Sequence, residues 1–245
     1  MIQDAISAAM EALRAGRWAE AEVRAGEAVA ADPASPRAQQ MLVQARLTLA
    51  RAQASSGEAD AADATLARAC NQRPTALEAF IALGEMRKAR GDLAGAETVF
   101  QQGLGLAPDA QALWLGLASV RMAANDRLGA RAAIAHLDGT RFGARIARAQ
   151  LAFLEGDFAV AATLYGEALT ERPDAATIRM ERARALAEAG ERAAAEAELR
   201  RLARDGPLPL GRLILALAAA AHGRAFLRPT DAARFLNGAP EPAAA

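Results

Sequence analysis

The stretch from Leu77 to Asp109 reads LEAFIALGEMRKARGDLAGAETVFQQGLGLAPD, and its spacing predicts a pair of helices. In its first half, Phe80 and Leu83 are three residues apart and the small Gly84 follows them. Residues three and four apart share one face of a helix, so a helix over 77–89 has one apolar face. A second helix must pack on that face.

The second half of the stretch supplies that partner. Gly91 ends the first helix, and Ala96 and Phe100 belong to the apolar face of a second. We expect Gly84 to face Ala96, which would let the two backbones approach closely. Pro108 cannot continue a helix and therefore ends the unit. One such hairpin cannot bury its own apolar face, so it predicts similar neighbours.

Similar units occur along the chain. A glycine, an alanine five residues later and a proline twelve residues after that recur at Gly16, Ala21 and Pro33; at Gly57, Ala62 and Pro74; at Gly156, Ala161 and Pro173; and at Gly190, Ala195 and Pro207. A degenerate copy between Pro108 and Gly156 keeps Ala130 but has Asn125 at the turn and no closing proline. The pattern predicts six helix pairs in phase.

The spacing aromatic-x2-Leu-Gly, then Ala-x3-aromatic, then proline, within 34 residues, resembles the tetratricopeptide repeat motif. It is carried by Phe80, Leu83, Gly84, Ala96, Phe100 and Pro108. The resemblance implies an all-α fold, a right-handed α-solenoid of about six helix pairs with a C-terminal capping helix. We expect the solenoid and its cap to span residues 1–223, followed by a short helix and a disordered tail over 224–245. The expected repeats are 2–35, 36–76, 77–110, 111–140, 141–175 and 176–207, with the cap at 208–223.

Two repeats depart from the 34-residue spacing. Pro33 and Pro74 are 41 residues apart, and neither glycine nor proline interrupts the chain between Arg37 and Ser56. We therefore predict one long helix over 36–55; the alternative is a loop insertion over 34–40. The turn of the fourth repeat lies 31 residues before that of the fifth. A shortened second helix over 127–138 would accommodate that difference, and the array would bend there unless the difference is only sequence drift.

Composition and charge exclude several classes of protein. The chain has 11 basic and 14 acidic residues up to residue 120, and 18 and 15 after it, a polarity too mild to indicate a nucleic-acid or membrane partner. Cys70 is the only cysteine, and we expect it to be a buried structural thiol. His136 and His222 have no ligand at metal-binding spacing, so we expect no metal, no cofactor and no catalytic residue. The apolar runs are too short to span a membrane, and a cytoplasmic protein is expected.

The resemblance also indicates where a partner would bind. In tetratricopeptide arrays the first helices of the pairs line a concave groove, mainly through the second, fifth, ninth and twelfth positions of each repeat. The fifth position is apolar in every repeat here. The candidate groove residues are Ile6, Met10, Leu47, Arg51, Ile81, Glu85, Lys88, Leu115, Ser119, Met122, Ile146, Gln150, Phe153, Met180 and Arg184. The alternative is that the fifth positions only complete contacts between adjacent pairs.

Arginines occupy core-like positions in the last two repeats. These are Arg145, Arg148, Arg179 and Arg182, at the places that hold Phe80 and Leu83 in the third repeat. We expect their stems to pack while the guanidinium groups reach Glu155, Glu181, Glu188 or solvent. The alternative is an anionic partner at this end of the chain.

The leading functional hypothesis is a non-catalytic adaptor that binds a peptide or an amphipathic helix of another protein in the concave groove. A first alternative is a regulatory subunit of an enzyme supplied by another chain. A second is an RNA-binding helical array, against which the neutral charge and the few aromatic residues argue. A further alternative is that Phe226 to Leu236 fold back into the groove or are exchanged between two chains.

Overall fold

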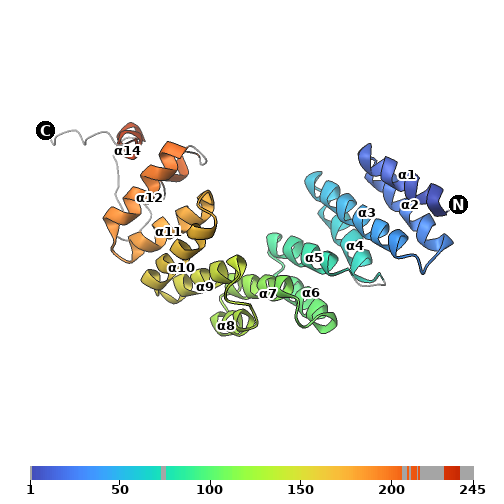
Figure 1. Ribbon diagram of the computed structural model, residues 1–245, viewed down its shortest axis with the longest axis horizontal. Helices are drawn as coiled ribbons and strands as arrows, with labels where there is room; N and C mark the ends of the chain where they lie inside the picture. The colour runs from blue at the N-terminus through green and yellow to red at the C-terminus, as the bar shows by residue number, and fades with distance from the viewer. Residues whose placement is uncertain are drawn as a thin grey trace. The chain divides into compact units, whose positions relative to one another are not determined.

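The computed structural model describes residues 2–72, 76–205, 209, 211–213, 215 and 229–237. All regular secondary structure in these residues is helical, which confirms the all-α prediction (Figure 1). The helices are α1 (Ile2–Arg14), α2 (Trp18–Ala31), α3 (Pro36–Ser55), α4 (Ala59–Cys70), α5 (Leu77–Ala89), α6 (Leu93–Leu106), α7 (Gln111–Ala123), α8 (Arg127–Ala135), α9 (Phe142–Glu155), α10 (Phe158–Glu171), α11 (Ala176–Glu188), α12 (Arg192–Asp205) and α14 (Pro229–Leu236).

The chain divides into two compact units, Met1–Asp126 and Arg127–Ala245. In the first unit, α1 packs on α2, α3 on α4 and α5 on α6, and each second helix also packs on the first helix of the next pair. The first helices α1, α3, α5 and α7 contact one another in sequence and so form a continuous layer. In the second unit, α9 packs on α10, α10 on α11, and α11 on α12. Each unit is therefore a stack in which successive helices pack on one another.

The turn inside each pair has the conformation that the glycine pattern predicts. Five glycines have a positive φ between 72° and 90°, a backbone region that other residues rarely adopt. They are Gly16, Gly57, Gly91, Gly156 and Gly190. Asn125 takes this role in the degenerate repeat with a φ of 59°, which asparagine tolerates better than most residues. The anchors read from the sequence are thus the turns of the fold.

The small residue in the motif makes room for an aromatic ring. A Cβ at Gly84 would lie 2.5 Å from Cζ of Phe100, and one at Gly116 would lie 2.2 Å from the Cε1 atom of the same ring. The ring of Phe100 is fully buried between the two helices that carry these glycines. Gly84 thus makes room for the Phe100 ring, a contact that the sequence pattern did not predict.

The two irregular repeats behave differently. Helix α3 spans Pro36–Ser55, which confirms the long helix and rules out the loop insertion. Its additional residues, 36–42, lie at the N-terminal end, before the place where α5 begins in the third repeat. Helix α8 is indeed short, but it ends at Ala135 and not at Asp138.

The C-terminal helix α14 packs against α12. Phe235 and Leu236 are buried in a cluster with Leu199 and Leu202 of α12, and the Arg200 guanidinium lies 4.1 Å from the centroid of the Phe235 ring. The short helix expected before Gly238 is thus present. Most of the expected cap, the residues Phe226 and Leu227, and the tail over 238–245 lie outside the described residues.

Candidate binding groove

A pocket of about 440 Å³ lies between the inner face of α3 and the start of α5. Two of the residues predicted from the repeat positions, Leu47 and Arg51, line it. The complete lining is Pro36, Gln39, Gln40, Val43, Gln44, Leu47, Thr48, Arg51, Ala76 and Glu78. Gln44 and Glu78 were not among the predicted residues, although both occupy the second position of their repeats, which the family pattern also uses.

The helical period of α3 explains which side chains face the pocket. Gln40, Gln44, Leu47 and Arg51 follow one another at intervals of four, three and four residues and so form one stripe. Val43 and Leu47 are half-buried and give the pocket an apolar wall, whereas the two glutamines and the arginine are exposed. The Arg51 guanidinium has no side-chain partner among the described residues. The stripe therefore offers apolar surface, amide donors and acceptors, and one free cation.

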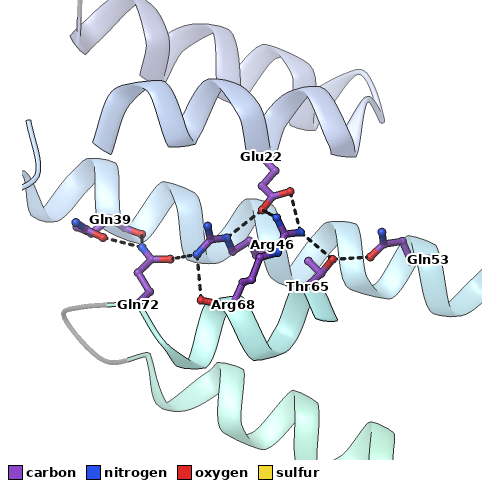
Figure 2. Close-up of polar contacts among 7 residues, drawn as sticks. All are labelled: Glu22, Gln39, Arg46, Gln53, Thr65, Arg68 and Gln72. Atoms are coloured by element: carbon purple, nitrogen blue, oxygen red, sulfur yellow. Dashed lines mark hydrogen bonds and ion pairs between the residues drawn. The ribbon is translucent and has the colours of Figure 1, made fainter. Parts of the chain in front are cut away.

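The floor of the pocket is held by a buried pair of amides (Figure 2). Nε2 of Gln39 donates to the carbonyl oxygen of Pro33 at 3.0 Å. Nε2 of Gln72 donates to Oε1 and to the backbone oxygen of Gln39, at 2.7 Å and 2.9 Å. Because buried amides are costly unless they are paired, these bonds fix the first turn of α3 against the end of α4.

Arg46 connects this amide pair to α2 (Figure 2). Its Nη1 donates to Oε1 of Gln72 at 3.0 Å and to the carbonyl oxygen of Arg68 at 3.2 Å. Its Nε donates to Oε1 of Glu22 at 3.1 Å, and Arg68 also pairs with that carboxylate. Arg46 stands at the fourth position of its repeat, where the third repeat has Phe80. A polar network therefore replaces the aromatic ring and ties α2, α3 and α4 together behind the pocket.

The other predicted groove residues of the first unit lie in different environments. Ile6 is only 1% exposed, packed with Ala28 and Ala38, and so it does not line an accessible surface. The physical reason is the long α3, because Ala38 belongs to the additional turns that cover α1. Lys88 pairs with Glu85 at 2.5 Å and donates to Oγ of Ser119 at 3.0 Å, which joins α5 to α7. The remaining four are half-buried: Met10, Ile81, Leu115 and Met122.

In the second unit, two predicted residues meet directly. The Arg184 guanidinium lies 4.6 Å from the centroid of the Phe153 ring, a cation–π contact between α11 and α9. Phe153 and Ile146 both pack on the core of this unit, whereas Gln150 is exposed. Met180 packs against the cluster that contains Phe235, so it belongs to the contact with α14.

The partners expected for the core-position arginines were wrong for three of the four, whereas Arg148 reaches solvent as one alternative expected. Arg145 pairs with Glu167 and Glu171, and Arg179 and Arg182 share Glu198. The reason is that these positions face the second helix of the same pair, α10 or α12, so its carboxylates lie closer than those on their own helix. Arg148 is exposed, and its guanidinium lies against Gly139.

Few side chains in the described part of the chain are candidates for reactivity or metal binding. Cys70 is buried, and burial raises the pKa of its thiol to about 11, so it is protonated and unreactive at neutral pH. The described residues contain no group of three metal-ligating side chains. None of the described helices is long and apolar enough to cross a membrane.

Comparison with known proteins agrees with the geometry. The tetratricopeptide repeat family profile matches residues 152–220. No curated protein sequence matches the chain. Among solved structures, a tetratricopeptide repeat protein from Parabacteroides merdae is 14% identical with a TM-score of 0.67, covering 96% of this chain and 98% of that one.

Two further structures share the fold. The Pseudomonas aeruginosa pilF protein is 17% identical with a TM-score of 0.60, covering 85% of this chain and 93% of that one. YrrB, described as a tetratricopeptide repeat protein with an unusual peptide-binding site, is 17% identical with a TM-score of 0.53, covering 80% of this chain and 96% of that one. The family match over residues 152–220 and the likeness to these solved structures show that the chain is similar to tetratricopeptide repeat proteins and shares their fold of stacked helix pairs.

Proposed function

We propose that the protein is a non-catalytic adaptor that binds a segment of another protein in the groove between α3 and α5. The observation that carries this proposal is the open pocket lined by Leu47 and Arg51, two positions that the family uses for partner contacts. The half-buried residues Ile81, Leu115 and Met122 would extend the contact along α5 and α7. The likeness to YrrB in fold supports the same class of function.

The pocket lining indicates the chemistry of the bound segment. An apolar side chain of the partner would pack on Val43 and Leu47, at a gain of about 25 cal/mol per Å² of apolar surface buried. Gln40 and Gln44 can each donate and accept, so they suit main-chain groups of an extended peptide or polar side chains on a helix. Arg51 would bind a carboxylate, and Glu78 would bind a basic group.

Site-specific photo-cross-linking tests the proposal. The photoreactive residue p-benzoylphenylalanine is placed at Gln44 in the groove and, as the control, at the exposed Ala19 on α2. We expect a partner segment to be cross-linked from position 44 and not from position 19. The Leu47→Glu substitution should reduce this cross-link by about tenfold, since it places a charge on the apolar wall.

Two controls make the outcome decisive. Circular dichroism should show that the Leu47→Glu protein keeps its helix content, because Leu47 is only half-buried. The cross-linked segment is then identified by mass spectrometry, synthesised, and titrated against the intact protein. Equal cross-linking from both positions, or a synthetic segment that binds the Leu47→Glu protein as well as the original, would contradict the proposal.

A further inference from the structure

A second groove, of about 360 Å³, lies in the second unit between α8 and α10, with α9 as its floor. We call it the apolar groove. Its lining is Arg131, Ile134, Ala135, Arg148, Leu151, Ala152, Glu155, Asp157, Val160 and Leu164. It involves none of the predicted groove residues, although Arg148 is one of the arginines for which an anionic partner was the alternative prediction. It opens between second helices of the pairs, whereas the α3–α5 groove is formed by first helices.

Large apolar side chains reach the surface at this groove. Val160 of α10 is 53% exposed, and Leu164, one turn further along the same face, is half-buried. Leu128 of α8 is 79% exposed and precedes Arg131 by three residues, so it extends the same face of that helix. Exposed apolar surface that continues into a groove is typical of interaction sites.

The corresponding place in the first unit has the opposite chemistry. There, a pocket that we call the charged groove is lined by Asp60, Asp63, Ala64, Arg87, Arg90 and Asp92. Asp63 and Arg131 each follow the turn residue of their pair by six positions, and Asp92 and Asp157 each follow it by one. Two ion pairs occupy the charged groove, Asp63 with Arg87 and Asp60 with Arg90. An apolar groove is therefore not a general consequence of stacking these repeats.

Two charges at the rim of the apolar groove lack side-chain partners in the described part of the chain. Arg131 and Glu155 pair with each other at 2.6 Å. By contrast, Arg148 only lies against Gly139, and Asp157 makes no capping hydrogen bond although it precedes α10. Arg148 and Glu155 are seven residues apart on α9, or about 10 Å along the helix axis. Asp157 follows Glu155 by two residues. Asp157 therefore lies at one end of the groove, and Arg148 lies at the other.

We propose that the apolar groove docks an amphipathic α-helix of another protein. Apolar side chains of that helix would insert between α8 and α10 onto Val160 and Leu164. A helix fits better than a strand because it satisfies its own backbone hydrogen bonds, whereas a strand would leave backbone groups unpaired against an apolar lining. The rim charges set the direction: a carboxylate of the partner helix lies at Arg148, and a cation about two turns away lies at Asp157.

The probe for this proposal is a stapled helical peptide of about four turns. It carries leucines along one face, a glutamate on one side and a lysine two turns later. In a second peptide the positions of the glutamate and the lysine are exchanged. Binding to the full chain is measured by fluorescence polarisation. Val160→Arg blocks the groove, and Val23→Arg is the matched control, because Val23 on α2 is similarly exposed at 59%.

We expect the first peptide to bind and Val160→Arg to weaken its binding by about tenfold or more, while Val23→Arg leaves it unchanged. Arg148→Glu combined with Asp157→Lys should invert the preference between the two peptides, a change that loss of fold would not produce. Arg148→Glu alone leaves Asp157 in place and should only abolish that preference. The Leu47→Glu substitution should not change the binding of either peptide, so the test of this site is independent of the α3–α5 groove.

Three results would overturn the proposal. One is the absence of binding by either peptide up to millimolar concentration. Another is equal binding by the Val160→Arg and Val23→Arg proteins. The third is a dimer of the unmodified chain, detected by light scattering, that Val160→Arg alone dissociates, because the occupant would then be a second copy of this chain.

Discussion

The charged groove of the first unit and the apolar groove of the second differ in how one ion pair is placed. In the charged groove, Arg87 donates to both carboxylate oxygens of Asp63, at 2.8 Å and 2.7 Å. In the apolar groove the arginine and the carboxylate are on the opposite helices. Arg131 lies on the second helix of its pair and donates to Glu155 on the first helix of the next pair. Both pairs are separated by 24 residues in the sequence.

The difference follows from the length of the repeats. Arg87 precedes its turn glycine by four residues, but Glu155 precedes Gly156 by one. The fourth repeat is three residues shorter than the standard 34. The residue 24 positions after Arg131 is Glu155, and it therefore lies three places later in its repeat than Arg87, which is 24 positions after Asp63. The place of Arg87 is consequently taken by Ala152. The shorter repeat thus places the ion pair nearer the end of α9 and leaves the centre of the groove apolar.

Breaking the ion pair of the charged groove should give the largest effect. The Arg87→Ala substitution leaves Asp63 without its two hydrogen bonds while both helices still shield it from water. We expect the free energy of unfolding to fall by about 2 kcal/mol. Arg131→Ala in the apolar groove removes an arginine that is 64% exposed and should cost only about 0.5 kcal/mol. Urea unfolding followed by circular dichroism measures both, and equal losses would show that the two pairs do not differ in strength.

Replacing both partners with leucine should have a smaller effect. A protein with Asp63→Leu and Arg87→Leu has no unpaired charge, so its stability should lie within about 1 kcal/mol of the original. The substitution also makes the charged groove resemble the apolar one, and it should increase the fluorescence of an apolar surface-binding dye. The single variant Asp63→Leu is the control, because it leaves Arg87 unpaired. A double variant less stable than that control would refute the prediction.

Much of the fold could be predicted because it depends on local spacing. Five turns follow from a glycine, and the long α3 follows from the absence of glycine and proline between Arg37 and Ser56. The end of α8 was placed too late, because residues 136–138 contain no strong stop signal before Gly139. Local patterns decide where helices begin and turn, but the last turn of a short helix depends on what packs against it.

The candidate groove was less predictable because it depends on contacts between distant residues. Position in the repeat indicated Leu47 and Arg51, which line the pocket, but it also indicated Ile6, which the additional turns of α3 bury. The amide pair of Gln39 and Gln72 spans 33 residues and has no periodic signal. Arg46 could have been found, since it shares the fourth repeat position with Arg145 and Arg179.

The smallest expected effect is the response of the charged groove to acid. Hydrogen bonds from Arg87 lower the pKa of Asp63 below its ordinary value of 3.8, despite the opposing effect of partial burial. A lowered carboxyl pKa adds stability that is complete above the ordinary value and is lost as the pH falls through the lowered one. The advantage of the original protein over Asp63→Asn, which keeps one acceptor oxygen and should therefore lose less than about 1 kcal/mol, should shrink in acid. The Val160→Arg protein removes no carboxylate, so its stability difference from the original should not change with the titration of Asp63. Urea unfolding near neutral pH and below the lowered pKa distinguishes the two, and a constant advantage over Asp63→Asn would mean that the ion pair does not stabilise the charged groove.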